Sequence, residues 1–181
     1  MTINTQILLE NETVALYPLK ETDLDALYNV ASDAKIWEQH PNKDRWKREV
    51  FETFFTGAMQ SKGAFRIVDK ATGNTIGCTR FYNYNETEDS ILIGYTFYAV
   101  AYWGKSINPL VKTLMLNYIF QFVSKVHFHV GASNLRSQIA ISRLGAEKIA
   151  EQEVTYFGEV PKMNFVYEIQ KVNWLKSSQL L

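Results

Sequence analysis

The hydrophobic and polar positions of the chain repeat with two different periods, which predicts a mixture of strands and helices. Hydrophobic residues three and four apart, typical of helices, lie within 22–31, 44–63, 107–122 and 134–145. Short runs rich in β-branched and aromatic residues, typical of strands, occupy 13–19, 64–68, 75–84, 91–100, 126–130, 147–155 and 164–171. The predicted order is β-α-α-β-β-β-α-β-α-β-β, an α/β protein with a mixed, mostly antiparallel sheet flanked by about four helices.

The connections between these elements indicate how the strands pair. Short turns at 72–74 and 85–89 join three successive strands, which predicts an antiparallel meander. A long helix separates the strand at 91–100 from the strand at 126–130, so this pair is expected to be parallel with a right-handed crossover. The sequence contains no repeat, low-complexity tract or linker, and we therefore expect residues 1–181 to form a single domain.

Residues with strong end preferences mark where the helices are expected to begin and stop. Thr22 is a potential N-cap, with Asp25 three residues later. Asn108 is a good N-cap for the long helix, and Pro109 suits its first position. Gly145 is of the residue type that commonly follows a helix end.

Composition and charge restrict the class of protein. Hydrophobic residues make up 46% of the 181 residues, and 19 basic residues balance 19 acidic ones. A neutral chain argues against nucleic-acid binding driven by bulk charge and against a polybasic membrane-surface protein. The N-terminus lacks the basic start and apolar run of a signal peptide, and no stretch is long and apolar enough for a membrane span. We therefore expect a soluble, cytoplasmic protein.

The few cysteine and histidine residues limit the chemistry further. Cys78 is the one cysteine, so an internal disulfide and a cysteine-rich zinc site are excluded. The three histidines do not have metal-ligand spacing, and no metal site is expected. Cys78 stands inside a predicted strand, where it is expected to be a small buried side chain rather than a nucleophile.

The segment 97–109, which joins a strand to the long helix, carries the first functional signal. Gly104 permits a tight turn or a close approach of a ligand, and the free amides of the helix start favour an anion such as phosphate. Lys105 is in place to add a charge. The P-loop is excluded because Ala99 stands where its first glycine is required, and the dinucleotide fingerprint lacks two of its three glycines. An ordinary strand-to-helix turn would have a similar sequence.

A second polar segment, Asn134-Leu-Arg-Ser137, opens the next predicted helix. Asn134 and Ser137 lie on one side of its first turn, where the two parallel strands are expected to end. Both side chains are also common helix caps without any further role.

Taken together, these segments resemble the Gcn5-related N-acetyltransferases (GNAT), in particular the branch of the ribosomal-protein N-terminal acetyltransferases. The motifs that carry the resemblance are Val14 to Asp23, Ile93-Gly94-Tyr95, Tyr102 to Ser106, and Asn134 through Ser137 and Ile141 to Leu144-Gly145-Ala146. The resemblance covers residues 13 to about 170. It implies an acyl-CoA N-acyltransferase fold with a splayed pair of parallel strands, and acetyl-CoA as cosubstrate.

The resemblance also implies roles for individual residues. Phe97, Tyr98 and Ala99 would border the pantetheine, with the amide of Tyr98 steadying the oxyanion. Asn134 and Ser137 would meet the pantetheine arm and the sulfur. Two arginines would reach the adenosine phosphates, although ion pairs within the protein are an equally good expectation for them. These are Arg136 and Arg143, and the backbone expected to hold the pyrophosphate is that of Trp103, Gly104, Lys105, Ser106, Ile107 and Asn108.

Three positions depart from the pattern of the family. Ala101 replaces a polar residue at the start of the phosphate loop, and Ser106 replaces a Gly or Ala at its end. Leu92 stands where many members of the branch carry a glutamate that is a potential base. These departures leave open whether catalysis is retained.

The implied reaction is direct attack of a neutral primary amine on the acetyl thioester in a ternary complex. Ser137 is the predicted proton donor to the thiolate. The general base is left open between His40, His127, His129 and water. Tyr95 is expected in the core.

We therefore predict an N-acetyltransferase that acts on a protein or peptide N-terminus or on a small-molecule amine. The balanced charge argues against polycationic acceptors such as polyamines and aminoglycosides. The alternatives are a non-catalytic acyl-CoA-binding module of the same fold and an unrelated mixed α/β domain. Trp174 is expected either to pack on a second subunit in a homodimer or to lie in a loose tail.

Overall fold

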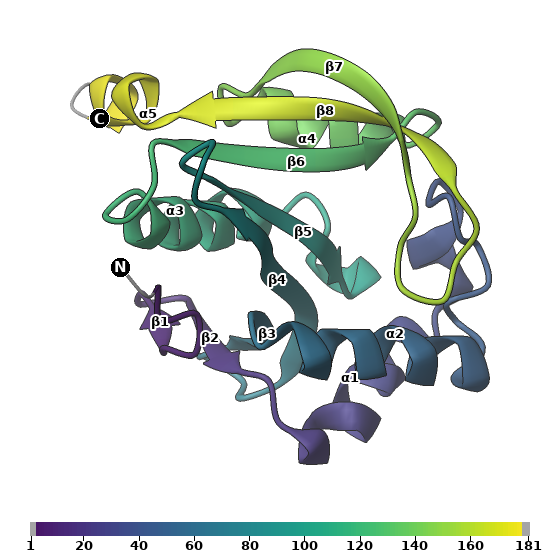
Figure 1. The fold of residues 1–181 in the computed structure, drawn as a ribbon. Helices are drawn as coiled ribbons and strands as arrows, with labels where there is room; N and C mark the ends of the chain where they lie inside the picture. The colour runs from purple at the N-terminus through teal and green to yellow at the C-terminus, as the bar shows by residue number, and fades with distance from the viewer. Residues whose placement is uncertain (1–2, 179–181) are drawn as a thin grey trace.

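An eight-stranded sheet forms the centre of the computed structural model, which describes residues 3–178 (Figure 1). Its strand order is β1-β2-β3-β4-β5-β6-β8-β7, and every neighbouring pair is antiparallel except β5 and β6. This confirms the mixed, mostly antiparallel sheet. The strands are β1 (Leu9–Glu10), β2 (Val14–Pro18), β3 (Ala64–Asp69), β4 (Thr75–Asn85), β5 (Ser90–Tyr98), β6 (Lys125–Gly131), β7 (Glu147–Val154) and β8 (Lys162–Gln170).

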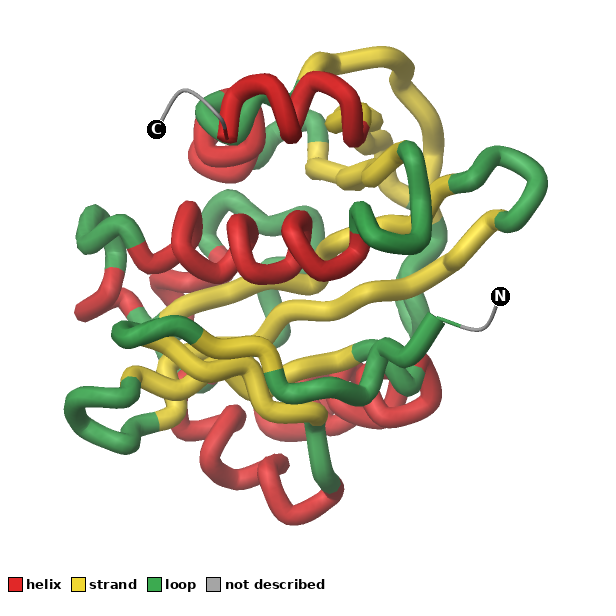
Figure 2. Tube along the Cα trace, turned by 90° about the vertical axis from the view of Figure 1, so that its left-hand side faces the viewer, coloured by secondary structure: helices red, strands yellow, loops and turns green. Residues whose placement is uncertain are grey.

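Helices lie on both sides of the strands (Figure 2) and cover two separate hydrophobic cores. One core joins the sheet to α1 and α2 through aromatic side chains such as Trp37, Phe51 and Phe54. The other lies beneath α3, whose Val111, Met115 and further apolar residues are fully buried. None of the helices within residues 3–178 is long and apolar enough to span a membrane. The helices are α1 (Leu24–Ala31), α2 (Arg48–Ser61), α3 (Ile107–Ile119), α4 (Leu135–Ser142) and α5 (Lys171–Ser178).

The two parallel strands stay together for only a short distance. The pairing of β5 with β6 runs from Ser90 and Lys125 to Leu92 and His127, and no further pair follows. From there β6 stays with β8 along its whole length, and β5 stays with β4 across a bulge near Tyr95, whose φ is 53°. In Figure 1 the two strands diverge from a common start. The sequence pattern predicted that this pair is parallel, and the opening is the splay that the family resemblance implied.

Several helix ends differ from the sequence-based expectation. Thr22 is not an N-cap, because a 3-10 turn at Glu21–Asp23 precedes α1 and the carboxylate of Asp23 accepts a hydrogen bond from the amide of Lys20 instead (2.9 Å). The second helix begins at Arg48 rather than near residue 44. The helix expected to run to Gly145 ends at residue 142, although Gly145 does adopt the left-handed conformation with φ 87°.

The start of the long helix is also different. α3 begins at Ile107 with Ser106 as its N-cap residue, so Asn108 and Pro109 already lie in its first turn. Ser106 adopts a left-handed φ of 59° and makes no capping bond with its side chain. The side chain of Asn108 accepts a hydrogen bond from the hydroxyl of Tyr98 at 3.1 Å, which ties the helix start to β5.

The last helix, α5, was not predicted, because Val172 and Leu175 are exposed and leave no buried apolar stripe. Trp174 was expected on a second subunit or in a loose tail, and both expectations are wrong. Its side chain is 8% exposed in the core beneath α3, and its indole N–H donates to the side-chain oxygen of Asn117 at 2.8 Å.

Candidate functional site

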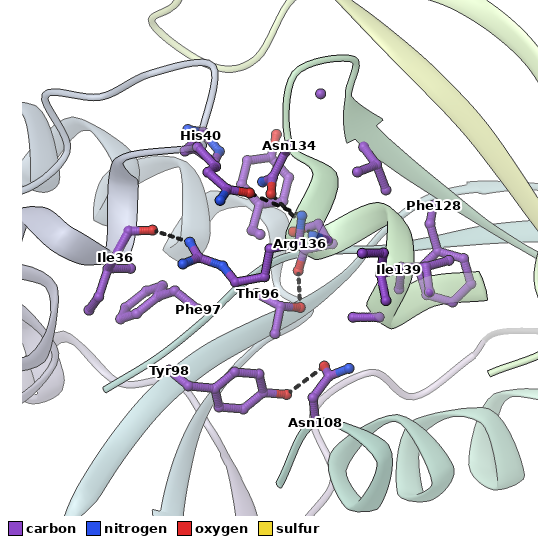
Figure 3. Close-up of a pocket in the computed structure, with 18 of the residues that line it drawn as sticks. Ile36, His40, Thr96, Phe97, Tyr98, Asn108, Phe128, Asn134, Arg136 and Ile139 are labelled. Carbon is purple, nitrogen blue, oxygen red and sulfur yellow. Dashed lines mark hydrogen bonds between the residues drawn. The ribbon is translucent and has the colours of Figure 1, made fainter. Parts of the chain in front are cut away.

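A cavity of about 740 Å³ fills the opening between β5 and β6. Its walls come from the diverging halves of the two strands, the segment 102–109 with the start of α3, the start of α4, and the segment 36–41 ahead of α2 (Figure 3). The elements that meet here are far apart in sequence, and the divergence of the two strands is what makes room for them.

One end of the cavity is formed by the loop before α3. Gly104 adopts a φ of 74°, and a side chain built there would meet no atom within 4 Å, so the backbone is open to a ligand. The indole N–H of Trp103 donates to the carbonyl of Tyr98 at 3.1 Å, which holds the loop against β5. The first amides of α3 lie at this end, with the positive end of the helix dipole. This end is suited to a negatively charged group such as a phosphate.

Most of the residues that the sequence predicted to bind the cofactor line this cavity. Two of them do not line it. Ala99 turns its amide to β4, where it donates to the carbonyl of Ile76 at 2.8 Å. Lys105 is exposed, with its ammonium 5.3 Å from the ring centre of Tyr102. The predicted residues that do line the cavity are Phe97, Tyr98, Trp103, Gly104, Ser106, Ile107, Asn108, Asn134, Arg136, Ser137 and Arg143.

The start of α4 contributes polar groups. Asn134 is the N-cap, and its side chain accepts from the amide of Ser137 at 3.1 Å, as predicted. Arg136 lays its guanidinium 4.0 Å from the ring centre of Trp103 and donates to the carbonyl of Ile36 at 3.0 Å. Among residues 3–178, no ion pair engages Arg136 or Arg143. No carboxylate within ion-pair distance therefore competes with an anionic ligand for either arginine, although the charge of Glu38 acts on Arg136.

The backbone of β5 directs one amide into the opening. Successive residues of a strand turn their N–H groups to opposite edges, and the amide of Ala99 is bonded to β4. The amide of Tyr98 consequently points to the other edge, toward β6. Because the pairing with β6 ends at Leu92, no ladder partner meets this amide.

The three histidines have different surroundings. His40 lines the cavity, but burial and the nearby charge of Arg45 hold its pKa well below the usual range. His129 also lines the cavity, and burial lowers its pKa to about 4. His127 lies outside the cavity, where its Nε2 contacts a carboxylate oxygen of Glu168 at 2.8 Å. Of the two strand histidines, only His129 reaches the cavity.

The other end of the cavity is aromatic and holds a buried ion pair that was not predicted. Arg45, which is 2% exposed, donates from Nε and Nη2 to Glu159 at 3.0 and 2.5 Å. These residues are 114 positions apart, so no local pattern in the sequence could reveal the pair. The aromatic residues that line this end are Trp37, Tyr82, Tyr95, Phe97 and Tyr156.

A second buried cation, Lys112 of α3, was also missed. It lines the cavity and is 2% exposed. Its Nζ lies 2.6 Å from the hydroxyl of Thr96 and 3.1 Å from that of Thr79. Burial lowers its pKa to about 7. Its position, four residues after Asn108 and three before Met115 on the buried face of α3, is the signal that was available.

The charged residues that line the cavity are basic, and one of them, Arg45, is neutralised by Glu159 behind the wall. No aspartate or glutamate lines it within the described part of the chain, whereas four basic residues do. They are Arg45, Lys112, Arg136 and Arg143. Nor do any three His, Cys, Asp or Glu side chains of residues 3–178 cluster in a way that could hold a metal ion.

Comparison with known proteins identifies the class to which this fold and cavity belong. Residues 13–147 match the family described as the acetyltransferase (GNAT) domain. The chain therefore belongs to the GNAT family, whose chemistry is acyl transfer from a CoA thioester. This excludes the reading as an unrelated α/β domain. No curated protein matches the sequence.

Solved structures share the fold at low sequence identity. A GCN5-related N-acetyltransferase from Brucella melitensis has a TM-score of 0.82 at 18% identity, covering 96% of this chain and 83% of its own. A putative ribosomal-protein-serine acetyltransferase from Vibrio cholerae has a TM-score of 0.72 at 14% identity, covering 93% of this chain and 99% of its own. A spermidine N-acetyltransferase from Vibrio cholerae, in complex with CoA and spermine, has a TM-score of 0.68 at 18% identity, with coverages of 91% and 99%. These likenesses show the shared fold.

Proposed function

We propose that this protein transfers the acetyl group of acetyl-CoA to a primary amine by direct attack in a ternary complex. The observation that carries the proposal is the cavity in the opening between β5 and β6, with the start of α3 at one end and an aromatic chamber at the other. A long donor with a phosphate at one end and a thioester at the other fits such a shape, and the amine would enter from the aromatic end.

The donor would be held mainly by backbone and by the start of α3. The amides from Trp103 to Asn108 would bind the pyrophosphate, with the dipole of α3 behind them. Arg136 and Arg143, which form no ion pair among the described residues, would meet the adenosine phosphates. Phe97 and Tyr98 would border the pantetheine. The positions of Ala99 and Lys105 outside the cavity remove support for their predicted contacts.

The transfer itself needs an oxyanion donor and a proton for the leaving thiolate. The amide of Tyr98, which points toward β6 without a ladder partner, would stabilise the oxyanion as the amine attacks. Ser137 lines the cavity beside the Asn134 cap and would give its hydroxyl proton to the thiolate.

The acceptor would be an amine without further positive charges. A polyamine carries several ammonium groups, which need carboxylates for favourable binding. The cavity wall offers none among the described residues and carries basic groups instead. The aromatic end provides a surface for an apolar or aromatic body next to the amine. A peptide N-terminus or a small-molecule amine satisfies these conditions.

Release of CoA from acetyl-CoA, measured with a panel of amines, tests this function. The panel contains spermidine, amino acids, short peptides with different N-terminal residues and aromatic monoamines. We expect CoA release that depends on a peptide or monoamine and exceeds the release with spermidine. Ser137→Ala should slow it, whereas Ser142→Ala, an exposed serine of the same helix that does not line the cavity, should leave it unchanged. Binding of acetyl-CoA without any amine-dependent release would favour the non-catalytic module.

A further inference from the structure

The histidine beside Arg45 has both of its ring nitrogens engaged. Nε2 of His40 lies 3.2 Å from Nη1 of Arg45, and a guanidinium can only donate. Nε2 is therefore the acceptor, and the proton on Nδ1 is donated to the carbonyl of Asn42 at 3.0 Å. In the other tautomer the lone pair of Nδ1 would accept from the amide of Asn42 at 2.9 Å. With either tautomer the lone pair of His40 already has a donor, so it is not available to an acceptor amine.

His129 on β6 does not present a lone pair to the cavity either. Its Nε2 lies 2.9 Å from the side-chain nitrogen of Gln152, which can only donate and so occupies the lone pair of Nε2. Its Nδ1 is buried and has no hydrogen-bond partner within residues 3–178. The remaining histidine, His127, lies outside the cavity and contacts Glu168.

Two further groups that could accept a proton are held by other contacts. Glu159 does not line the cavity, and its Oε1 accepts hydrogen bonds from both Nε and Nη2 of Arg45. Lys112 lies at the α3 end, where its Nζ contacts the hydroxyls of Thr79 and Thr96. No described contact brings either group to the aromatic end of the wall.

The tyrosines of the aromatic end are neutral phenols near pH 7, because burial raises the pKa of each; they are Tyr82, Tyr95 and Tyr156. Their ring centroids are 5.0 Å apart for Tyr82 and Tyr95 and 5.3 Å apart for Tyr95 and Tyr156, with the rings edge to face. Trp37 has the guanidinium of Arg45 5.7 Å from its ring centre. This end therefore offers apolar ring surface to the body of an acceptor.

Behind the ring of Tyr95 lies a second guanidinium, which forms no ion pair. Arg80 of β4 is 3% exposed and lies 3.8 Å from the ring centre of Tyr95. It donates to the carbonyls of Gly57 and Phe54 at 3.1 and 3.5 Å, and no acidic residue within 3–178 lies within ion-pair distance of it. A buried charge is weakly screened, so Arg80 opposes a further positive charge on the cavity side of this ring.

These surroundings distinguish the two forms of an acceptor amine. An ammonium would meet the charge of Arg80 and lone pairs that other donors already occupy. The neutral amine avoids both costs and packs its body against the rings. At pH 7.5 about a third of an α-amino group with a pKa of about 7.8 is neutral, compared with roughly one in 800 of a lysine amine with a pKa of about 10.4. The basicity of the acceptor therefore separates these two classes by roughly 250-fold.

We propose that the aromatic end binds its acceptor as the free amine and thereby selects weakly basic primary amines, such as α-amino and aromatic amines, over lysine-type amines. This inference rests on the proposed function. The ammonium form of the acceptor loses its extra proton to solvent before it binds. Its lone pair then forms the C–N bond to the thioester carbon, and the C–S bond breaks. One proton of the nitrogen replaces the proton that Ser137 gives to the thiolate.

The test uses acceptors with one shape and graded basicity. They are 2-phenylethylamine and its β-fluoro and β,β-difluoro derivatives, because fluorine near the amine lowers its pKa with little change in size. For a peptide acceptor, N-terminal alanine and 3,3,3-trifluoroalanine form the corresponding pair. CoA release at saturating acetyl-CoA gives kcat/KM for each acceptor from pH 5.5 to 10. We expect kcat/KM to rise about tenfold per pH unit up to the pKa of that particular amine and to stay level above it.

Two results would overturn the proposal. One is a rise that ends at the same pH for every acceptor, and the other is a fall in kcat/KM above the pKa of each amine. Either behaviour requires a group of the protein to accept the proton from a bound ammonium. Failure of the proposed function is distinguishable, since no amine would then cause CoA release at any pH.

Variants of the two cavity histidines test the assignment of their lone pairs. In His40→Asn and His129→Asn the rise of kcat/KM should end at the same pH as in the wild type with the same acceptor. A loss of about 100-fold together with this rise would identify that histidine as a base and contradict the proposal.

The charge behind Tyr95 is tested by binding alone. Arg80→Gln should raise the affinity of the protein–CoA complex for the ammonium of 2-phenylethylamine at pH 6 by about tenfold, whereas Arg80→Lys, which keeps the charge, should not. Equal affinities in the wild type and both variants would contradict the part assigned to Arg80. The acceptor series needs only the wild type, so it decides the proposal even if Arg80→Gln fails to fold.

Discussion

Each end of the cavity buries a basic side chain to the same extent, but only one of the two has a carboxylate partner among the described residues. Arg45 and Lys112 are both 2% exposed. Arg45 has a carboxylate partner in Glu159 and lies 4.9 Å from the ring centre of Phe54. Lys112 has only two hydroxyls. The aromatic end therefore holds a compensated charge, and the α3 end holds an amine that burial drives toward neutrality.

The choice of residue at each end follows from its chemistry. A guanidinium cannot lose its proton within proteins, so a buried arginine must be paired. A lysine ammonium can be discharged by desolvation and then becomes a base. Arg45 with its partner Glu159 therefore holds together segments at the aromatic end, whereas Lys112 is buried against β4 and β5 without a carboxylate within ion-pair distance.

The largest effect is expected on breaking the ion pair at the aromatic end. Glu159→Gln leaves the buried Arg45 without its carboxylate, which should reduce the free energy of unfolding by about 3–5 kcal/mol. Urea denaturation measures this change. Glu151→Gln is the matched control, because Glu151 pairs with Lys148 on the surface and should contribute less than about 1 kcal/mol. Equal effects of the two variants would mean that Arg45 does not depend on Glu159.

The lowered pKa of Lys112 should make the free energy of unfolding depend on pH. Burial lowers the pKa of Lys112 from 10.5 to about 7, so between these values the unfolded chain binds more protons than the folded one. The stability of the wild type relative to Lys112→Met should therefore rise with pH in this window, by about 1.4 kcal/mol per pH unit. Below pH 7 the difference should level off. Denaturation of both proteins at pH 6, 7, 8 and 9 checks this, and a difference independent of pH would show that Lys112 titrates normally.

The smallest effect is expected from one of the two hydroxyls that accept from Lys112. Thr79→Val removes an acceptor from Lys112 but leaves the contact with Thr96, so the loss of stability should be about 1 kcal/mol. Lys112 donates to this hydroxyl, and such an acceptor favours the charged amine, so its removal should also lower the pKa of Lys112 further. Titration of the ¹³C resonance of the Lys112 Cε, in protein labelled at its lysines, measures the second effect. A raised pKa would contradict the hydrogen bond from Lys112 to Thr79.

The sequence predicted the parts of the site that depend on local patterns. The strand at 91–100, the loop at Gly104 and the cap at Asn134 are all recognisable from residue types within a few positions, and the structure places them around one cavity. The exact helix start was wrong at Asn108, because its side chain bonds to Tyr98 on another element rather than to its own helix.

The groups that distinguish the two ends could not be predicted in this way. The pair of Arg45 and Glu159 joins segments that only the folded sheet brings together. Lys112 lies between the buried residues Val111 and Met115 of α3. The helical pattern alone therefore predicts that it lies at the edge of the buried face. Whether its amine then meets a carboxylate or two threonines is decided by β4 and β5, which are remote from α3 in sequence.

The central claim, that the opening between β5 and β6 binds acetyl-CoA, is tested most directly by thermal unfolding with and without this molecule, beside equal ATP and NAD controls. At a hundred times Kd, acetyl-CoA should stabilise the protein by about 2.7 kcal/mol. For a chain of this size this corresponds to a rise in Tm of about 5–10 °C. We expect that rise with acetyl-CoA and none with ATP or NAD. No shift at millimolar acetyl-CoA would contradict the account, and with it the role proposed for Ser137.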